Sequence, residues 1–286
     1  MSTTVTSQYP GSEISDSQLK EFALQQYKQA DVKAFNFPTE IIDLPSKGTV
    51  YPEGNPLASG KLEMKYMTAR EEDILTSANL IRQGVVLDKL FQSLIVSPIK
   101  YNDLITGDKN AIMIAARVLG YGKDYEVECT CQKCENKQKV NIDLSSLLDK
   151  TIAEEAVQVS PNNFTFTLPI SKRPVTFKLL THGDEKKLEY DLDAIKKKAT
   201  KDSVSPELSM RLKKTITSVD GNTDPAFISH FVDNELFAQD SKALRTYIKS
   251  VAPDVNLTFD FECQACGHIK ENMVIPIDTN FFWPNS

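Results

Sequence analysis

Two short cysteine clusters are the residues of this chain with the clearest chemistry. Cys131 and Cys134 form one C-x-x-C step, Cys263 and Cys266 form another, and a glutamine follows the first cysteine of each step. Two such steps supply four thiolates, which is the ligand set of a tetrahedral zinc site of the ribbon kind. Four protein ligands leave no open coordination position, so we expect a structural zinc rather than a catalytic one.

Two residues near the clusters are weighed as further ligands and left out. Cys129 lies two residues before Cys131, and Phe261 stands at the matching place before the second cluster. An aromatic counterpart indicates a packing position for Cys129. His268 follows the second cluster, and a single histidine beside a complete four-cysteine set is more often a polar supporting group than a ligand. The alternative to a zinc site is a set of four thiols without a metal.

The second cluster repeats the first together with the residues before it. Residues 235–266 align without a gap on residues 103–134 at a constant offset of 132 residues, which matches Asp240 with Asp108. An ungapped match through a helix, a strand and a cysteine step favours an internal duplication.

A second block repeats at a different offset. Residues 178–188 align on residues 65–75 at an offset of 113, so the second copy carries an insertion between its two blocks, around the Lys-rich stretch 196–214. Lysines alternate with acidic residues before that stretch, which is typical of a solvated helix face.

The elements expected in the first copy follow from hydrophobic period and punctuation. They are a strand at 61–67, a helix that starts at Thr68 with Glu71 in capping-box spacing and ends at Gly84, a helix at 86–95, a helix that Asp108 caps, and hairpin strands at 125–129 and 139–144.

The sequence therefore predicts an α+β protein with two duplicated halves. We expect the halves to be related by a pseudo-twofold axis and joined by the shared four-cysteine zinc ribbon. The predicted boundaries are an N-terminal extension at 1–40, partly disordered or a helical arm, a first half at 41–152, and a second half at 153–286 with the Lys-rich insertion.

Composition narrows the classes of function. A net charge of −6 over 286 residues argues against a general nucleic-acid binder. No run approaches the roughly 18 apolar residues of a membrane helix, and the polar N-terminus lacks the apolar core of a signal peptide. In a reducing cytosol, clustered cysteines indicate metal ligands before disulfides. We find no nucleophile elbow, phosphate loop or paired acids, so neither catalysis nor a small-molecule substrate is indicated.

Three segments are candidates for contacts with other proteins. The proline- and glycine-rich stretch 44–57 predicts a rigid loop suited to docking. Residues 17–31 predict a helix that either packs on the body or docks on a partner. The aromatic run Phe281-Phe282-Trp283 either folds back or anchors another protein.

Part of the chain resembles a known family. Leu-Pro-Ser-Lys-Gly at 44–48, Tyr-Pro at 51–52, Pro-Leu at 56–57 and Met-Thr-Ala-Arg-Glu-Glu-Asp-Ile-Leu at 67–75 resemble baseplate proteins of T-even-type tailed bacteriophages. The resemblance is best over about residues 41–145 and brings no catalytic residues. It implies a non-enzymatic part in tail morphogenesis, as a component of the baseplate hub or a factor in its assembly. The implied partners are other phage baseplate or hub proteins. The implied location is the host cytoplasm during assembly, and whether the protein stays in the virion is left open.

Two other functions stay open at this point. A zinc-ribbon nucleic-acid-binding or transcription-accessory protein would bind DNA or RNA with a salt-dependent affinity. A hydrolase or transferase with zinc as a scaffold is disfavoured, because the chain offers no nucleophile and base in a recognisable setting.

Overall fold

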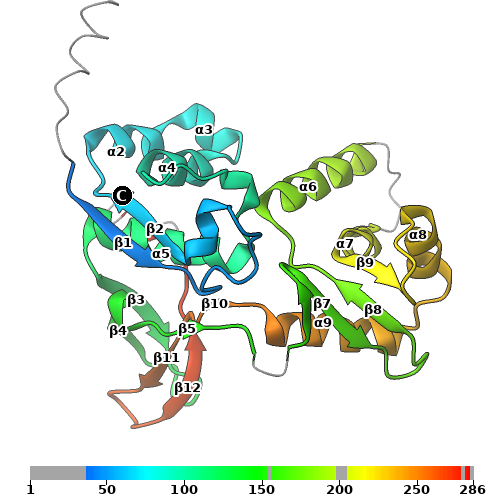
Figure 1. The fold of residues 1–286 in the computed structure, drawn as a ribbon. Coiled ribbons are helices and arrows are strands. Elements are labelled where there is room, and N and C mark those ends of the chain that lie inside the picture. Colours follow the sequence, from blue (N-terminus) through cyan, green and yellow to red (C-terminus); the bar gives the residue numbers. More distant parts are fainter. Residues whose placement is uncertain (1–36, 154–155, 198–204, 278–280, 284–286) are drawn as a thin grey trace, which may run out of the picture. The chain divides into compact units, whose positions relative to one another are not determined.

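The computed structural model describes residues 37–153, 156–197, 205–277 and 281–283. The chain divides into two compact units, Met1–Pro38 and Thr39–Ser286. The helix expected at 17–31 lies outside the described residues. The fold given below is that of the second unit, whose elements are labelled in Figure 1.

The first part of this unit runs to the middle of the chain. Its elements are β1 (Thr39–Asp43), η1 (Pro56–Ser59), β2 (Lys61–Lys65), α2 (Ala69–Thr76), α3 (Ala78–Arg82), α4 (Val86–Leu94), η2 (Tyr101–Asp103), α5 (Thr106–Tyr121), β3 (Asp124–Thr130), β4 (Lys137–Asp143), η3 (Leu144–Ser146) and β5 (Asp149–Lys150). β1 pairs with β2, and β3 pairs with β4 in a hairpin; both pairs are antiparallel.

The second part contains the largest sheet. Its elements are β6 (Gln158–Ser160), β7 (Asn163–Thr167), β8 (Pro174–Phe177), α6 (His182–Lys196), α7 (Glu207–Thr215), β9 (Ile216–Val219), α8 (Pro225–Asn234), α9 (Ala238–Val251), β10 (Asp254–Val255), β11 (Thr258–Glu262) and β12 (Ile269–Val274). The sheet has the order β6-β7-β8-β9, β11 pairs with β12, and β10 pairs with β5 of the first part. This mixture of helices and antiparallel sheets confirms the predicted α+β class.

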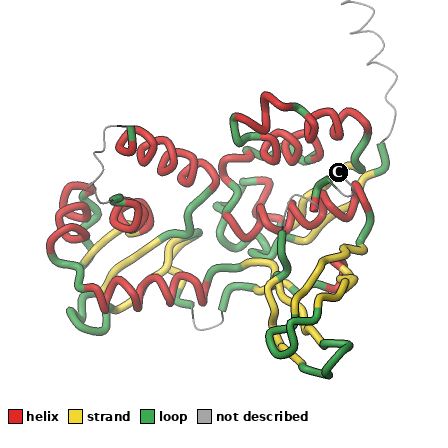
Figure 2. Tube along the Cα trace, turned by 180° about the vertical axis from the view of Figure 1, so that it is seen from behind, coloured by secondary structure: helices red, strands yellow, loops and turns green. Residues whose placement is uncertain are grey.

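Helix α9 covers one face of the four-stranded sheet, as the view in Figure 2 shows. The ring of Tyr247 stacks on Phe166 of β7 at 4.6 Å and meets the edge of Phe177 of β8 at 5.9 Å between centroids. Aromatic pairs of this kind add to the stabilisation from buried area, so this contact fixes α9 against the sheet.

The helix predicted to run from Thr68 to Gly84 is interrupted. Ser77 has an extended backbone, with φ −68° and ψ 103°, and separates α2 from α3. The predicted capping box at its start is confirmed, because the Glu71 carboxylate accepts a hydrogen bond from the Thr68 N–H at 3.0 Å.

Asp108 does not cap α5, so that prediction was wrong. The helix begins at Thr106, and Asp108 lies within its first turn, fully buried. Its carboxylate accepts hydrogen bonds from the Ser46 N–H at 3.0 Å, the Ser46 hydroxyl at 2.7 Å and the Tyr51 hydroxyl at 2.6 Å. The Asp108 carboxylate therefore holds the loop onto the helix instead of capping the helix start.

Asp240 does the same in the first turn of α9. Its carboxylate accepts hydrogen bonds from the backbone N–H groups of Ile170 at 2.7 Å and Ser171 at 3.0 Å. The loops held by the two carboxylates have related sequences, and each turns through a lysine of positive φ, Lys47 at 49° and Lys172 at 58°.

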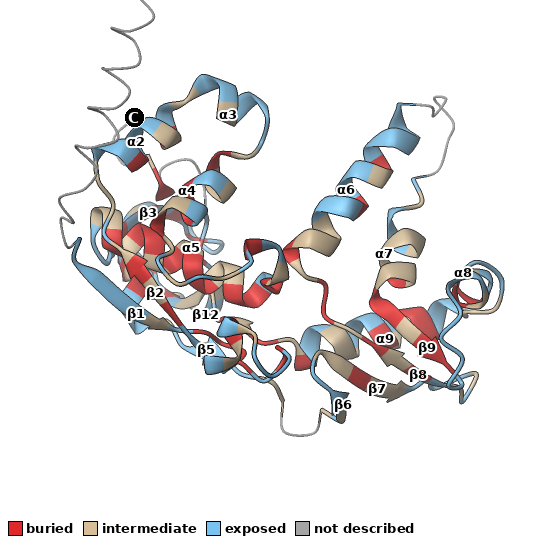
Figure 3. Ribbon diagram, turned by 45° about the horizontal axis from the view of Figure 1, so that its top comes forward, coloured by how far each residue is buried: buried red, intermediate tan, exposed pale blue. Residues whose placement is uncertain are grey.

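The first part of the loop at 44–57 is therefore packed into the core, whereas Pro52, Glu53 and Gly54 stay exposed. The buried residues of this part include Leu44, Pro45, Ser46, Val50 and Tyr51. Figure 3 shows the same concentration of buried residues along α5, which this loop contacts through Asp108.

The C-terminal aromatic run folds back onto the body, which decides between the two alternatives for this segment. Phe281 and Phe282 are 0% and 2% exposed. The ring of Phe281 meets Tyr125 edge to face at 5.0 Å, and the Trp283 indole N–H donates to the Leu75 carbonyl oxygen at 3.1 Å.

Gly107 allows the first turn of α5 to approach the chain after α9. A Cβ at this position would lie 1.9 Å from the carbonyl oxygen of Pro253. Neither a helix nor a backbone carbonyl can move aside as a side chain can, so a glycine is required here.

Gly107→Ala should lower the free energy of unfolding by about 1–3 kcal/mol, because the added methyl group forces two backbones apart. Gly120→Ala on the same helix is the matched control. The nearest neighbours of its Cβ would be side-chain atoms of Met67, and the two closest lie at the flexible end. Alanine also has the higher helix propensity, so we expect a change within about 1 kcal/mol. Urea unfolding of both variants checks this, and equal effects would contradict it.

The two buried carboxylates should respond to pH in opposite directions. Burial raises the pKa of Asp108 above the ordinary carboxyl value, and its hydrogen bonds only partly offset this. Burial also opposes ionisation of Asp240, but the N–H groups of Ile170 and Ser171 outweigh it and hold the pKa of Asp240 below the ordinary carboxyl value.

Asp240→Asn should lower the free energy of unfolding by about 1.5–3 kcal/mol at neutral pH, because an amide NH₂ would face a backbone N–H. The Asp240 pKa is depressed in the folded state, so the stabilisation by its carboxylate is lost as the pH falls through that pKa. The difference in free energy of unfolding between the wild type and Asp240→Asn should therefore shrink at low pH.

The Asp108→Asn variant should become more stable relative to the wild type as the pH rises from about 4 to 7, because the wild-type carboxyl then ionises in a buried site. Unfolding curves below about pH 4 measure the Asp240 trend, and curves from about pH 4 to 7 measure the Asp108 trend. Trends of the same sign would refute the assignment.

Candidate metal centre

The two C-x-x-C steps form the turns of the hairpins β3–β4 and β11–β12, which lie side by side in Figure 1. In the first turn the Cys131 N–H donates to the Asn136 carbonyl oxygen and the Glu135 N–H donates to the Cys131 carbonyl oxygen, both at 2.9 Å. These bonds close the turn and aim both sulfurs of the step in the same direction.

The second turn has the same hydrogen bonds at the offset of 132 residues. The Cys263 N–H donates to the His268 carbonyl oxygen at 2.9 Å, and the Gly267 N–H donates to the Cys263 carbonyl oxygen at 2.8 Å. Gly267 has a φ of 64°, and Glu135 adopts nearly the same φ of 58°. The turn requires this left-handed conformation at both positions, and Glu135 adopts it despite its Cβ.

The four predicted cysteines come together. Their Sγ atoms all lie within 4.8 Å of one another, with Cys131 and Cys266 3.8 Å apart and Cys134 and Cys263 3.6 Å apart. A tetrahedral metal with metal–sulfur bonds of about 2.3 Å separates its sulfurs by about 3.8 Å. The cluster therefore has the size and the chemistry to hold a metal ion.

Ionisation of the cluster is uneven. Burial opposes ionisation of Cys263, but N–H groups of Cys266 and Ala265 outweigh it and lower the pKa of Cys263 to about 6. The backbone of Asn136 favours a thiolate at Cys134, but the neighbouring thiols, that of Cys266 above all, outweigh it and raise the pKa of Cys134 to about 12. One thiolate forms readily, whereas four thiolates together require a cation to offset their charge.

Burial alternates through the cluster. The first cysteine of each step, Cys131 or Cys263, is 1% exposed, whereas the second, Cys134 or Cys266, is exposed. The inner sulfurs thus lie against the core and the outer ones toward solvent, which gives an ion a route of entry. All five cysteines of the chain are free thiols.

Cys129 and His268 lie outside this set of four. Cys129 is 4% exposed on β3, and its counterpart Phe261 on β11 is 2% exposed. Cys129 therefore packs in the core, as its aromatic counterpart predicted. His268 contributes its backbone carbonyl to the second turn.

Gln138 joins the two hairpins and was not identified from the sequence. Its amide NH₂ donates to the Glu262 carbonyl oxygen, and its amide oxygen accepts from the Gln264 N–H, each at 2.8 Å. The matching residue of the second copy is Lys270, so the repeat gave no signal for this contact.

The described residues contain one cluster of this kind. Within them, no second group of three or more His, Cys, Asp or Glu side chains converges to hold an ion. Among the described helices, none is long and apolar enough to span a membrane.

Comparison with known proteins identifies the family. No curated protein and no solved structure matches the chain. The family model described as T4 bacteriophage base plate protein matches residues 37–283. The match covers most of the chain and takes in the buried loop, both cysteine hairpins and the C-terminal aromatic run. The chain belongs to the T4 bacteriophage base plate protein family.

Proposed function

We propose that this protein acts in assembly of the baseplate hub, as a structural component or as an assembly factor without enzymatic activity. The family match over residues 37–283 carries the proposal, because it assigns a baseplate role to nearly the whole described chain. The partners are other baseplate or hub proteins. The protein would meet them in the host cytoplasm while the tail is built.

The cluster Cys131, Cys134, Cys263 and Cys266 would bind one zinc ion in this function. The sulfur separations of 3.6 and 3.8 Å support zinc, since they match the edges of a tetrahedral four-thiolate site. Four protein ligands fill the coordination sphere, so the ion would stabilise the fold and leave no position for a substrate.

The halves 41–152 and 153–286, which follow the extension at 1–40, would derive from a duplication. The matched hydrogen bonds of the two cysteine turns support this, as do the equivalent positions of Asp108 in α5 and Asp240 in α9.

A further correspondence lies at the second offset. Lys65 pairs with Glu71 at 2.8 Å, and Lys178 pairs with Asp184 at 2.7 Å, in each case beside the capping box that starts a helix. The two related halves, each of which contributes one hairpin, would meet at the metal. The zinc would then join the halves into a body rigid enough to position partners.

Purified protein should contain about one zinc per chain. Cys131→Ser/Cys263→Ser should abolish the zinc and lower the melting temperature, because binding of structural zinc contributes to folding. Cys129→Ser is the control, since it removes a buried thiol outside the cluster and should keep the metal. Elemental analysis and thermal unfolding with and without a chelator measure this, and full zinc retention in the double variant would refute the shared site.

Affinity capture of the tagged full chain from phage-infected cells, followed by mass spectrometry, tests the hub assignment. Recovery of hub proteins is the expected result, because the proposed function requires direct contact with them. Recovery of polymerase subunits instead, released by raised salt, would replace it with the nucleic-acid alternative.

A further inference from the structure

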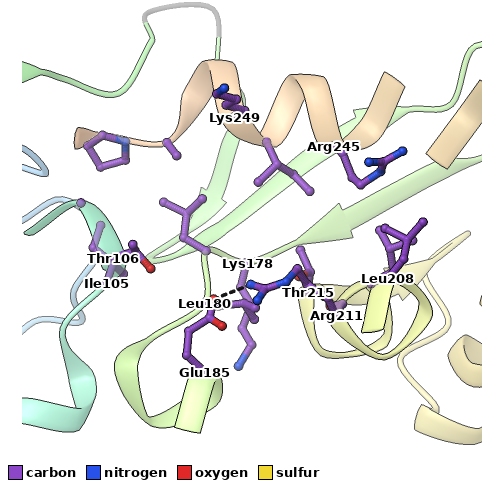
Figure 4. A pocket seen from close by; sticks show the side chains of 16 residues that line it. Ile105, Thr106, Lys178, Leu180, Glu185, Leu208, Arg211, Thr215, Arg245 and Lys249 are labelled. Atoms are coloured by element: carbon purple, nitrogen blue, oxygen red, sulfur yellow. Dashed lines mark hydrogen bonds and ion pairs between the residues drawn. The ribbon is translucent and has the colours of Figure 1, made fainter. Parts of the chain in front are cut away.

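A cavity of about 330 Å³ lies between α7 and α9, over the end of the four-stranded sheet. Figure 4 shows its walls, with α9 on one side, α7 on the other and the start of α5 closing one end. The apolar part of the lining is formed by Ile105, Leu179, Leu180, Leu208, Leu212 and Ile248. Neither the metal cluster nor the buried carboxylates contribute to it.

The cavity reaches the surface. Leu208 on α7 is 47% exposed, although its side chain lines an apolar cavity. Arg245 and Lys249, one turn apart on α9, line the opposite wall and are exposed. An apolar interior with an open, charged mouth is the usual form of a binding site and not that of a packing defect.

The mouth is strongly cationic, with four basic side chains and one acidic one in the lining. Arg211 is paired with Glu185 at 2.5 Å, and Lys178 is paired with Asp184 at 2.7 Å.

The basic residues of α9 have no such partners. In the described part of the chain no carboxylate pairs with Arg245 or Lys249, and Arg245 donates only to the Ser241 carbonyl oxygen of its own helix. On a chain of net charge −6, this local excess of positive charge is left for a ligand.

We propose that this cavity is the docking site for an acidic amphipathic segment of another baseplate protein. The proposal rests on the baseplate function above, which requires protein partners. A groove between two helices receives the apolar side chains of such a segment, and its Asp or Glu residues pair with Arg245 and Lys249. The volume lies at the low end of the roughly 300–1,000 Å³ range of ligand sites, which suits a few inserted side chains better than a large cofactor.

The probe is a displayed library of random peptides, selected on the full zinc-loaded chain. The selected peptides should combine apolar residues with Asp or Glu. A synthetic, fluorescent copy of the best peptide should bind with an affinity that falls as salt is raised, because the contact is partly ionic. Peptides without acidic residues, or binding that ignores salt, would overturn the proposal.

Variants locate the binding. Arg245→Glu/Lys249→Glu should weaken the peptide by roughly tenfold or more, since two attractive contacts become repulsive. Leu208→Glu should weaken it through the apolar wall. Both variants change exposed residues, and circular dichroism verifies their folding.

The matched control is Lys187→Glu/Lys242→Glu. It reverses the same charge at exposed positions on α6 and α9 that do not line the cavity, and it should bind like the wild type. Equal effects of the two double variants would overturn the site.

Two further outcomes separate this proposal from others. Self-association of the wild type that Arg245→Glu/Lys249→Glu abolishes would assign the cavity to a second copy and overturn the proposed partner. Capture of hub proteins by that variant at the wild-type level would refute the cavity proposal and leave the hub function intact. Failure of the wild type to capture hub proteins would count against the hub function, whatever the peptides do.

Discussion

Four thiols within 4.8 Å of one another are the constraint on which the junction of the two hairpins depends. As thiols they make only weak contacts, and as thiolates they repel each other unless a cation lies between them. Apart from the sulfurs, the hydrogen bonds of Gln138 join the same hairpins. The geometry of this junction therefore depends on the protonation of the cluster, and it would depend on whether a metal ion is bound.

The buried carboxylates of Asp108 and Asp240 occupy similar positions but differ in the charge state that their surroundings favour. Asp108 and Asp240 hold related loops from the same position of two helices, yet only Asp240 has two backbone N–H donors as its loop contacts. Hydroxyl donors from Ser46 and Tyr51 can reverse their role, so Asp108 does not need to be charged. Two carboxylates at matching positions thus differ in charge preference, although each of them holds a loop.

The sequence sufficed where a contact is local or repeated. Cysteine spacing predicted the cluster because a C-x-x-C turn fixes its own sulfurs, and the repeat predicted that the two turns would correspond. The role of Asp108 was missed because its partners lie 57 and 62 residues away in sequence, beyond any periodic pattern. Glu135 in a left-handed conformation was missed because side-chain type only biases φ. The cavity at α7 and α9 depends on how distant elements pack, and no motif marks it.

The cysteine cluster and the cavity between α7 and α9 differ in how charge is placed. At the cysteine cluster, the four side chains face one another, so thiolate charge that forms there would be offset by a bound cation. At the cavity, positive charge lies at the mouth of an apolar interior, and the basic residues of α9 have no acidic partner in the described chain. An unbalanced charge at the surface influences what approaches it. In the two proposals, a metal at the first site would hold the hairpins together, and the second site would give the protein a surface that another protein can recognise.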